Sequence, residues 1–215
     1  MPTHHAIAID GPAASGKSTV AQALAERLGI LFVNSGAMYR AVTWWFVKQG
    51  YSMEDEEAIR SRFPELEMTC DQQDGRSLVA IDGQVLGSEL RSEAVHAHVS
   101  KVARVPEVRA KLVAKQREYL ALNHLVMEGR DIGTVVFPET PFKFFVTASE
   151  AIRQQRRQDQ GQSDAIGKRD QMDSSRKASP LKAAEDALVI DTSALSQQEV
   201  VEALLEGLAT RGWKD

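Results

Sequence analysis

The residues of this chain best suited to chemistry lie in a glycine-rich loop near its start. One eight-residue run fills every fixed position of the pattern G-x-x-x-x-G-K-[ST], namely Gly11-Pro12-Ala13-Ala14-Ser15-Gly16-Lys17-Ser18. Such a loop cradles a polyphosphate on its backbone N–H groups, and the N-terminus of the helix that follows adds favourable dipole charge. We expect Lys17 to reach the β- and γ-phosphates and the Ser18 hydroxyl to coordinate Mg²⁺.

The sequence around this loop supports the same interpretation. A short apolar run over residues 6–9 precedes it, and a helical pattern over residues 18–28 follows it. This strand–loop–helix order distinguishes a phosphate-binding loop from a chance glycine cluster. We therefore predict that residues 11–19, including Thr19 just past the pattern, bind a nucleoside triphosphate.

A second group of candidate residues consists of arginines that follow predicted strands. Phosphoryl transfer between two anionic substrates needs many cations, because its catalysis depends mostly on positioning and charge stabilisation. A single arginine is more often a surface residue than a ligand. Several of them in loops at the carboxyl ends of strands favour a binding site. The candidates are Arg40, Arg109, Arg130, Arg153, Arg157, Arg169 and Arg176.

Composition and charge exclude several classes of partner. The chain has 215 residues and a formal net charge of −4, which argues against a nucleic acid polymer held by bulk charge. Residues 151–182 differ, with eight Lys or Arg against four Asp, which indicates a segment that handles a small, dense anion. A single cysteine, Cys70, and the lack of a signal peptide or an apolar run of membrane-spanning length favour a cytoplasmic protein without a membrane partner.

The elements that must position these residues alternate between strands and helices. Apolar strands are predicted at residues 6–9, 30–33, 125–128, 143–146 and 187–191. Helical patterns lie between them, and a capping box at residues 196–199 begins the last helix. This order predicts an α/β fold of three layers, with a five-stranded parallel sheet and helices on both faces.

Residues 52–90 interrupt this alternation. Asp82-Gly83 separates two apolar runs, 78–81 and 84–86, and predicts a tight hairpin turn. A local antiparallel pair does not belong to a parallel sheet, so we interpret this region as an inserted subdomain. Two helices, over about residues 92–103 and 106–121, are predicted to follow it.

Three motifs resemble those of the bacterial cytidylate kinases. The first runs from Asn34 to Arg40, the second from Glu128 to Pro138, and the third comprises Arg169-Asp170, Asp173 and Arg176. The resemblance runs almost from end to end, and the second motif, Glu-Gly-Arg-Asp-Ile-Gly-Thr-Val-Val-Phe-Pro, is highly specific. The chain departs from the family pattern at Asn34 and Glu128, where aspartate is common, and in a shorter stretch between Arg157 and Arg169.

The resemblance implies a reaction in which ATP, with Mg²⁺, phosphorylates CMP or dCMP. By similarity, Arg40 and Arg130 hold the acceptor phosphate near Ser35, and Ser100, Arg109 and Asp131 read the cytosine. A carboxylate suits the cytosine 4-amino group, because the carbonyl of uracil would be repelled. Arg169, Asp173 and Arg176 line the ribose and phosphate side. The implied catalytic residues are Lys17, Arg130 and Arg157.

The resemblance also implies a division of the chain into five segments. Residues 1–40, 109–150 and 177–215 form the core, residues 41–108 the monophosphate-binding insert, and residues 151–176 a short lid. A monomer is expected. Two alternatives remain open: another small-molecule kinase with this loop, acting on UMP, AMP, dTMP or shikimate, and a non-catalytic switch that binds ATP.

Overall fold

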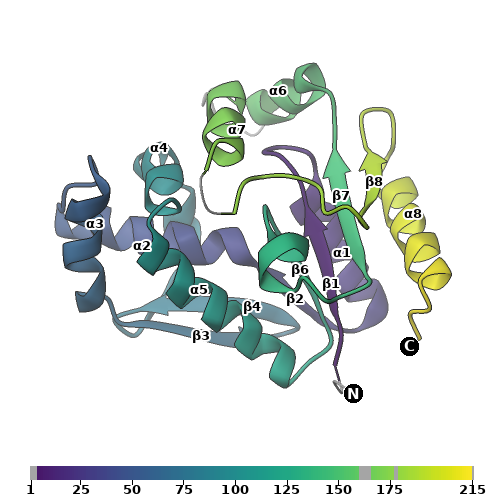
Figure 1. Cartoon of the computed structure of the whole chain (residues 1–215), viewed down its shortest axis with the longest axis horizontal. Coiled ribbons are helices and arrows are strands. Elements are labelled where there is room, and N and C mark those ends of the chain that lie inside the picture. The colour runs from purple at the N-terminus through teal and green to yellow at the C-terminus, as the bar shows by residue number, and fades with distance from the viewer. Residues whose placement is uncertain (1–3, 160–165, 177–178, 215) are drawn as a thin grey trace.

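A parallel sheet with helices on both faces forms the centre of the protein (Figure 1). The computed structural model describes residues 4–159, 166–176 and 179–214, apart from the side chains of Ile166, Lys168 and Arg169. Five strands run parallel in the order β2-β6-β1-β7-β8. They are β1 (Ala6–Asp10), β2 (Leu31–Asn34), β6 (Leu125–Gly129), β7 (Lys143–Thr147) and β8 (Leu188–Asp191). All five predicted strands and the predicted three-layer fold are confirmed.

Alternation along the strands divides the core between the two faces of the sheet. On β1, Ile7 and Ile9 join a buried cluster with α1 (Lys17–Leu28) and α8 (Gln197–Thr210). Ala6 and Ala8 point to the other face and join a cluster around the π-helical turn η4 (Ile132–Val136). A strand buried on both faces reads as a continuous apolar run, which is what the sequence shows at β1.

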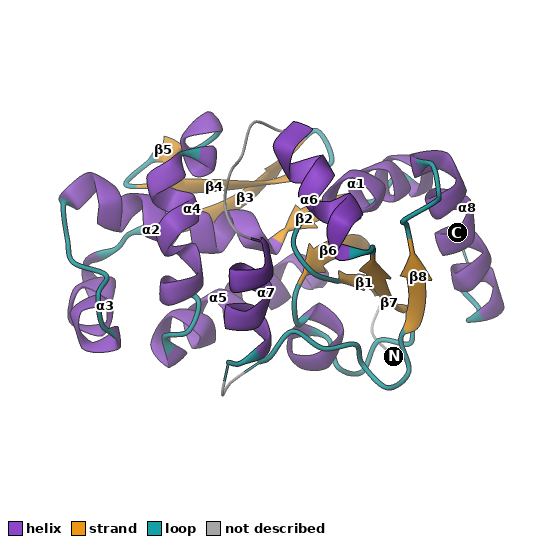
Figure 2. Cartoon of the chain, turned by 90° about the horizontal axis from the view of Figure 1, so that it is seen from above, coloured by secondary structure: helices purple, strands orange, loops and turns teal. Residues whose placement is uncertain are grey.

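A second helical body lies beside the sheet (Figure 2). It surrounds its own buried cluster, which extends from Met38 to Leu112. Its elements are the helices α2 (Ser35–Gln49), α3 (Glu56–Arg62), α4 (Glu93–Val102) and α5 (Pro106–Glu118), with the short turns η1 (Phe63–Glu65), η2 (Ser88–Arg91) and η3 (Tyr119–Ala121). Of these, α3 was not predicted from the sequence.

The hairpins of this region correct one expectation. Asp82-Gly83 joins β4 (Arg76–Ile81) to the short β5 (Gln84–Val85), as predicted. A longer hairpin, which was not predicted from the sequence, pairs β4 with β3 (Met68–Gln73). The antiparallel strands are not separate from the central sheet, because Phe32 of β2 pairs with Arg76 and donates its N–H to Gly75 O at 2.8 Å. The turn of the hairpin thus extends the core sheet beyond β2.

Two helices, α6 (Glu150–Asp159) and α7 (Ile166–Ser174), lie above the carboxyl ends of β1 and β7 (Figure 1). Seen from above, α7 lies between the helical body and the core (Figure 2), and it contacts both α4 and α6. The division of the chain into core, insert and lid segments stays a prediction. Among the described helices, none combines the length and the apolar character needed to cross a bilayer.

Candidate active site

The glycine-rich loop connects the end of β1 to the start of α1. Gly11 lies against β7, where a Cβ atom would come within 2.0 Å of Val146 O, so no other residue fits without moving backbone. Gly16 is the N-cap of α1, with a left-handed φ of 87° that favours glycine. These two glycines fix the curvature of the loop and aim its N–H groups, together with the N-terminus of α1, at one place.

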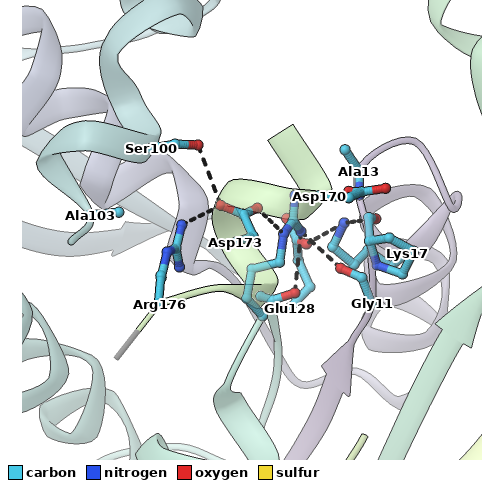
Figure 3. Close-up of polar contacts among 12 residues, drawn as sticks. Gly11, Ala13, Lys17, Ser100, Ala103, Glu128, Asp170, Asp173 and Arg176 are labelled. Carbon is cyan, nitrogen blue, oxygen red and sulfur yellow. Dashed lines mark hydrogen bonds and ion pairs between the residues drawn. The ribbon is translucent and has the colours of Figure 1, made fainter. Parts of the chain in front are cut away.

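Lys17 and Ser18 meet a carboxylate from the neighbouring strand. The Lys17 ammonium donates to Pro12 O at 2.9 Å and lies 4.0 Å from Glu128 Oε2 (Figure 3). The Ser18 hydroxyl donates to Glu128 Oε1 at 2.9 Å. Glu128 was assigned no role from the sequence, yet it contacts both residues, because β6 pairs with β1 and ends beside the loop. Strand adjacency, which no local motif encodes, was the missing signal.

The loop has the properties of an anion site. Ser15 Oγ is buried and has no hydrogen-bond partner among the described residues, and Lys17 is also buried. The Ala13 N–H donates to a carboxylate oxygen of Asp170, 3.2 Å away, so it already binds an anionic group. A buried hydroxyl, a buried ammonium and an amide N–H that donates to a carboxylate fit a polyphosphate. Ser18 and Thr19 are exposed at the rim of the loop, where Ser18 could reach a metal ion carried by that polyphosphate.

Arg130 joins this loop to a second polar cluster. Its Nη1 donates to Gly11 O at 3.0 Å and its Nε donates to Asp173 Oδ2 at 2.9 Å. Asp173 on α7 is buried, accepts from Ser100 Oγ of α4 at 3.3 Å and forms an ion pair with Arg176 (Figure 3). The fold therefore brings together four predicted substrate residues from three parts of the chain: Arg130 after β6, Ser100 on α4, and Asp173 and Arg176 on and just after α7.

A buried ion pair lies next to this cluster. Arg109 of α5 and Asp131 form a hydrogen-bonded pair in which both side chains are buried, and Arg109 also donates to Ala103 O at 3.2 Å. Burial raises the pKa of Asp131, and the positive charges of Arg109 and Arg176 oppose that rise. Arg109 lies over the Tyr39 ring, 5.5 Å from its centroid. The pair therefore presents a hydrogen-bond donor, Arg109, and an acceptor, Asp131, in a fixed arrangement to a polar ligand.

The start of α2 holds the remaining predicted acceptor residues. Ser35 Oγ donates to Glu128 O at 2.7 Å, which ties α2 to β6. Asn34 is the N-cap of α2, accepting from Ala37 N at 2.9 Å, and its Oδ1 also accepts from Arg40 Nη2 at 3.3 Å. Asn34, for which the sequence suggested no role, thus holds both the helix start and Arg40.

The arginines of α6 do not behave alike. Arg153 donates to Ala13 O at 3.2 Å and forms an ion pair with Asp170 of α7, so it reaches the loop. Arg157 is buried, and its guanidinium lies 3.2 Å from His96 Nδ1 of α4. Arg169 belongs to α7, but its side chain lies outside the described residues.

The comparisons with known proteins agree with this geometry. A family model described as cytidylate kinase matches residues 7–210. The chain belongs to the cytidylate kinase family. The cytidylate kinase of Caldanaerobacter subterraneus is 43% identical over 94% of this chain and 93% of its own length. That of Streptomyces avermitilis is 39% identical over 93% of this chain and 90% of its own length.

Solved structures share the fold of this cytidylate kinase family member at much lower sequence identity. An uncharacterized protein from Eubacterium ventriosum has a TM-score of 0.54 and 13% identity, over 96% of this chain and 99% of its own. Shikimate kinase from Acinetobacter baumannii has a TM-score of 0.50 and 16% identity, over 99% of this chain and 97% of its own.

The family member also has a cavity of about 370 Å³ beside the phosphate-binding loop. Its lining includes Gly16, Thr19, Arg156 and Thr192. The Arg156 guanidinium donates to Thr192 Oγ1 at 3.0 Å, and Thr192 Oγ1 donates to Ser15 O at 3.0 Å. Neither Arg156 nor Thr192 was among the predicted site residues, because their place beside the loop depends on how α6 and the end of β8 pack against it.

Proposed function

We propose that this protein transfers the γ-phosphate of ATP to CMP or dCMP, giving ADP and CDP or dCDP. Family membership supports the reaction. The single observation that carries it in the structure is Arg130, whose guanidinium contacts both the phosphate-binding loop and the Asp173 cluster. A residue in that place can hold an acceptor phosphate in line with the phosphate that leaves the donor.

Residues 11–19 would bind the donor. In this proposal the backbone N–H groups of the loop surround its phosphates, namely those of Gly11, Ala13, Ala14, Ser15 and Gly16. Lys17 supplies positive charge to the transferred group. Mg²⁺ bound to the nucleotide would neutralise charge between the phosphates, with Ser18 as its protein ligand. The Ser18 hydroxyl can keep its hydrogen bond to Glu128 Oε1, 2.9 Å away, because a metal ion would bind a lone pair of the hydroxyl oxygen.

The acceptor would lie between α2, α4 and the turn that follows β6. Ser35, Arg40 and Arg130 are proposed to bind its phosphate, and Asp173 with Arg169 and Arg176 its ribose. Ser100, Arg109 and Asp131 would bind the cytosine, with the Asp131 carboxylate accepting from the 4-amino group. Uracil has a carbonyl oxygen at that position, so a carboxylate repels it.

The helices α6 and α7 would complete the site. Arg153 and Arg157 are proposed to neutralise the transferring phosphate when these helices close, and closure would also exclude water as a competing acceptor. We further propose a monomer that works in the cytoplasm without a nucleic acid polymer or a membrane partner.

The deciding experiment measures ADP formation with a panel of acceptors. CMP and dCMP should support turnover with kcat/KM values well above those for UMP, AMP, dTMP and shikimate. Turnover with one of the other acceptors instead would assign a different small-molecule kinase. ATP binding without turnover on any acceptor would favour a nucleotide switch and contradict the proposal.

A further inference from the structure

A buried carboxylate lies between the phosphate-binding loop and the turn that carries Arg130 and Asp131. Asp10 is the last residue of β1, directly before Gly11, and only 4% of its surface is exposed. Its Oδ1 accepts from the Ile132 N–H at 2.8 Å, and its Oδ2 accepts from the Gly133 N–H at 2.8 Å. Both carboxylate oxygens therefore accept hydrogen bonds from two consecutive backbone N–H groups.

That piece of backbone directly follows the two residues proposed to bind the acceptor phosphate and base. Gly133 allows the approach: a Cβ atom there would lie 3.1 Å from Lys143 Cγ and 3.5 Å from Asp10 Oδ2. Arg130 makes a second connection, from its Nη1 to Gly11 O at 3.0 Å. The turn is thus held to the loop at both ends, by Asp10 on one side of Asp131 and by Arg130 on the other.

We propose that Asp10 is a positioning residue whose ionised carboxylate fixes Arg130 and Asp131 relative to the phosphate-binding loop, so that acceptor binding depends on its charge. The proposal deepens the proposed function and rests on it. Asp10 contacts neither the loop phosphate site nor the acceptor cluster directly in this arrangement; its effect passes through the amides of Ile132 and Gly133.

The groups around Asp10 bring the pKa of its carboxyl close to neutral pH. Burial raises its pKa to about 7, the two backbone N–H groups oppose the rise, Asp131 adds to it and Arg130 opposes it. From β7, Lys143 faces the same side as Asp10, with its ammonium on Asp186 and Pro138 O. Glu128 of β6 pairs with Ile9 and so points to the other face.

Protonation of Asp10 weakens its hydrogen bonds to the turn. A protonated carboxyl has one hydroxyl oxygen, which accepts a hydrogen bond less well than a carboxylate oxygen does. The bonds to the Ile132 and Gly133 N–H groups should therefore weaken as the pH falls through about 7.

The first test is steady-state kinetics of Asp10→Asn at pH 8. The amide keeps the shape but turns an N–H₂ towards a backbone N–H, so one of the two bonds is lost. KM for CMP should rise roughly 10- to 100-fold, the range for losing a hydrogen bond to a charged acceptor, while KM for ATP changes much less. Asp186→Asn is the matched control, because it removes a carboxylate beside Lys143 without touching the turn, and its kinetics should stay close to wild type. Equal increases in both KM values, or no increase, would overturn the proposal.

The second test is the pH dependence of the same constant. The CMP phosphate itself titrates near pH 6, and does so equally with both proteins. KM for CMP should therefore rise more steeply from pH 8 to pH 6 in the wild type than in Asp10→Asn. Parallel curves would contradict a role for the charge of Asp10.

The third test separates this proposal from the proposed function. Amide hydrogen exchange at Ile132 and Gly133, measured by NMR without any nucleotide, reports the two hydrogen bonds directly. Protection of one of these two amides should be lost in Asp10→Asn, and protection of both should fall in the wild type between pH 8 and pH 6, after correction for intrinsic exchange. Unchanged protection would show that the Asp10 carboxylate does not fix the turn. If Asp10→Asn fails to fold, the wild-type pH series alone still gives this answer. Loss of protection in a protein that does not phosphorylate CMP would refute the proposed function instead.

Discussion

At the scale of single residues, one guanidinium connects the two halves of the site. Arg130 contacts both Gly11 O of the donor loop and Asp173 of the acceptor cluster, whereas the Glu128 carboxylate contacts Lys17 and Ser18, which both belong to the donor side. Both residues lie at the end of β6, beside β1. A change at Arg130 should therefore affect donor and acceptor together, whereas a change of the Glu128 side chain should affect mainly the donor.

Lys17→Ala should lower kcat by several orders of magnitude without unfolding the protein. The ammonium is proposed to stabilise charge in the transition state, and Lys17 is the first residue of α1 and belongs to none of the apolar clusters, so core packing is retained. Steady-state kinetics and a circular dichroism melt check this together. A variant with a tenth of the wild-type kcat would contradict the role of Lys17.

Asp131→Asn should reduce kcat/KM for CMP by roughly 10- to 100-fold and narrow the preference for CMP over UMP. The asparagine amide can offer N–H₂ to the uracil carbonyl, which the carboxylate repels. Alanine is a poorer test, because it would leave Arg109 buried without its ion-pair partner. Steady-state kinetics with CMP, UMP and ATP test this role. Equal reductions of kcat/KM for ATP and for CMP would place Asp131 on the donor side.

The pKa of Asp10 gives stability a pH dependence of the opposite sign to that of acceptor binding. The folded pKa, about 7, exceeds the ordinary value of 3.8, so the fold favours the protonated carboxyl. Its contribution to stability is present below about pH 4 and is lost as pH rises through 7. Urea unfolding at pH 5 and pH 8 should show wild type losing stability relative to Asp10→Asn at the higher pH. A constant difference between the two proteins would show that burial does not raise this pKa.

At the scale of elements, the sequence could predict what depends on local pattern. Apolar runs predicted the five strands, and the loop motif predicted the glycine-rich connection, Gly11 to Gly16, between β1 and α1. Contacts set by strand order, such as Glu128 on Ser18, could not be read from neighbours in the chain. The pairing between β2 and β4 could not be predicted either, because it depends on the position in space of a turn that is distant from β2 in the sequence.

The helix α7 supplies a carboxylate to the loop that we propose binds phosphate. Asp170 accepts from the Ala13 N–H at 3.2 Å and pairs with Arg153. Donor phosphates must compete with this carboxylate for the same amide and the same cation. Asp170→Asn should therefore bind a non-hydrolysable ATP analogue a few-fold more tightly, as measured by calorimetry. Weaker binding would mean that Asp170 supports the donor site by holding Arg153 in place.

At the scale of the whole molecule, three bodies surround the site: the core sheet, the helical body from α2 to α5, and the α6–α7 pair (Figure 2). Arg130, Ser100 and Asp173 belong to different bodies and meet in one cluster. The relative placement of these bodies therefore determines whether the site is complete, and substrate binding is expected to draw them together.

The pairing of Phe32 with Arg76 has a mechanical consequence for such a movement. Hydrogen bonds join the helical body's hairpin to β2 along the strand, from the Phe32 N–H to Gly75 O at 2.8 Å and from the Asn34 N–H to Ser77 Oγ at 3.3 Å. A rotation that keeps these bonds must turn about this junction, so Arg40, which is hydrogen-bonded to Asn34, should move less than Ser100 on α4. A disulfide or a bulky residue at this pivot should slow turnover, with nucleotide affinities left nearly intact. Pre-steady-state kinetics would then show closure, rather than phosphoryl transfer, limiting the rate.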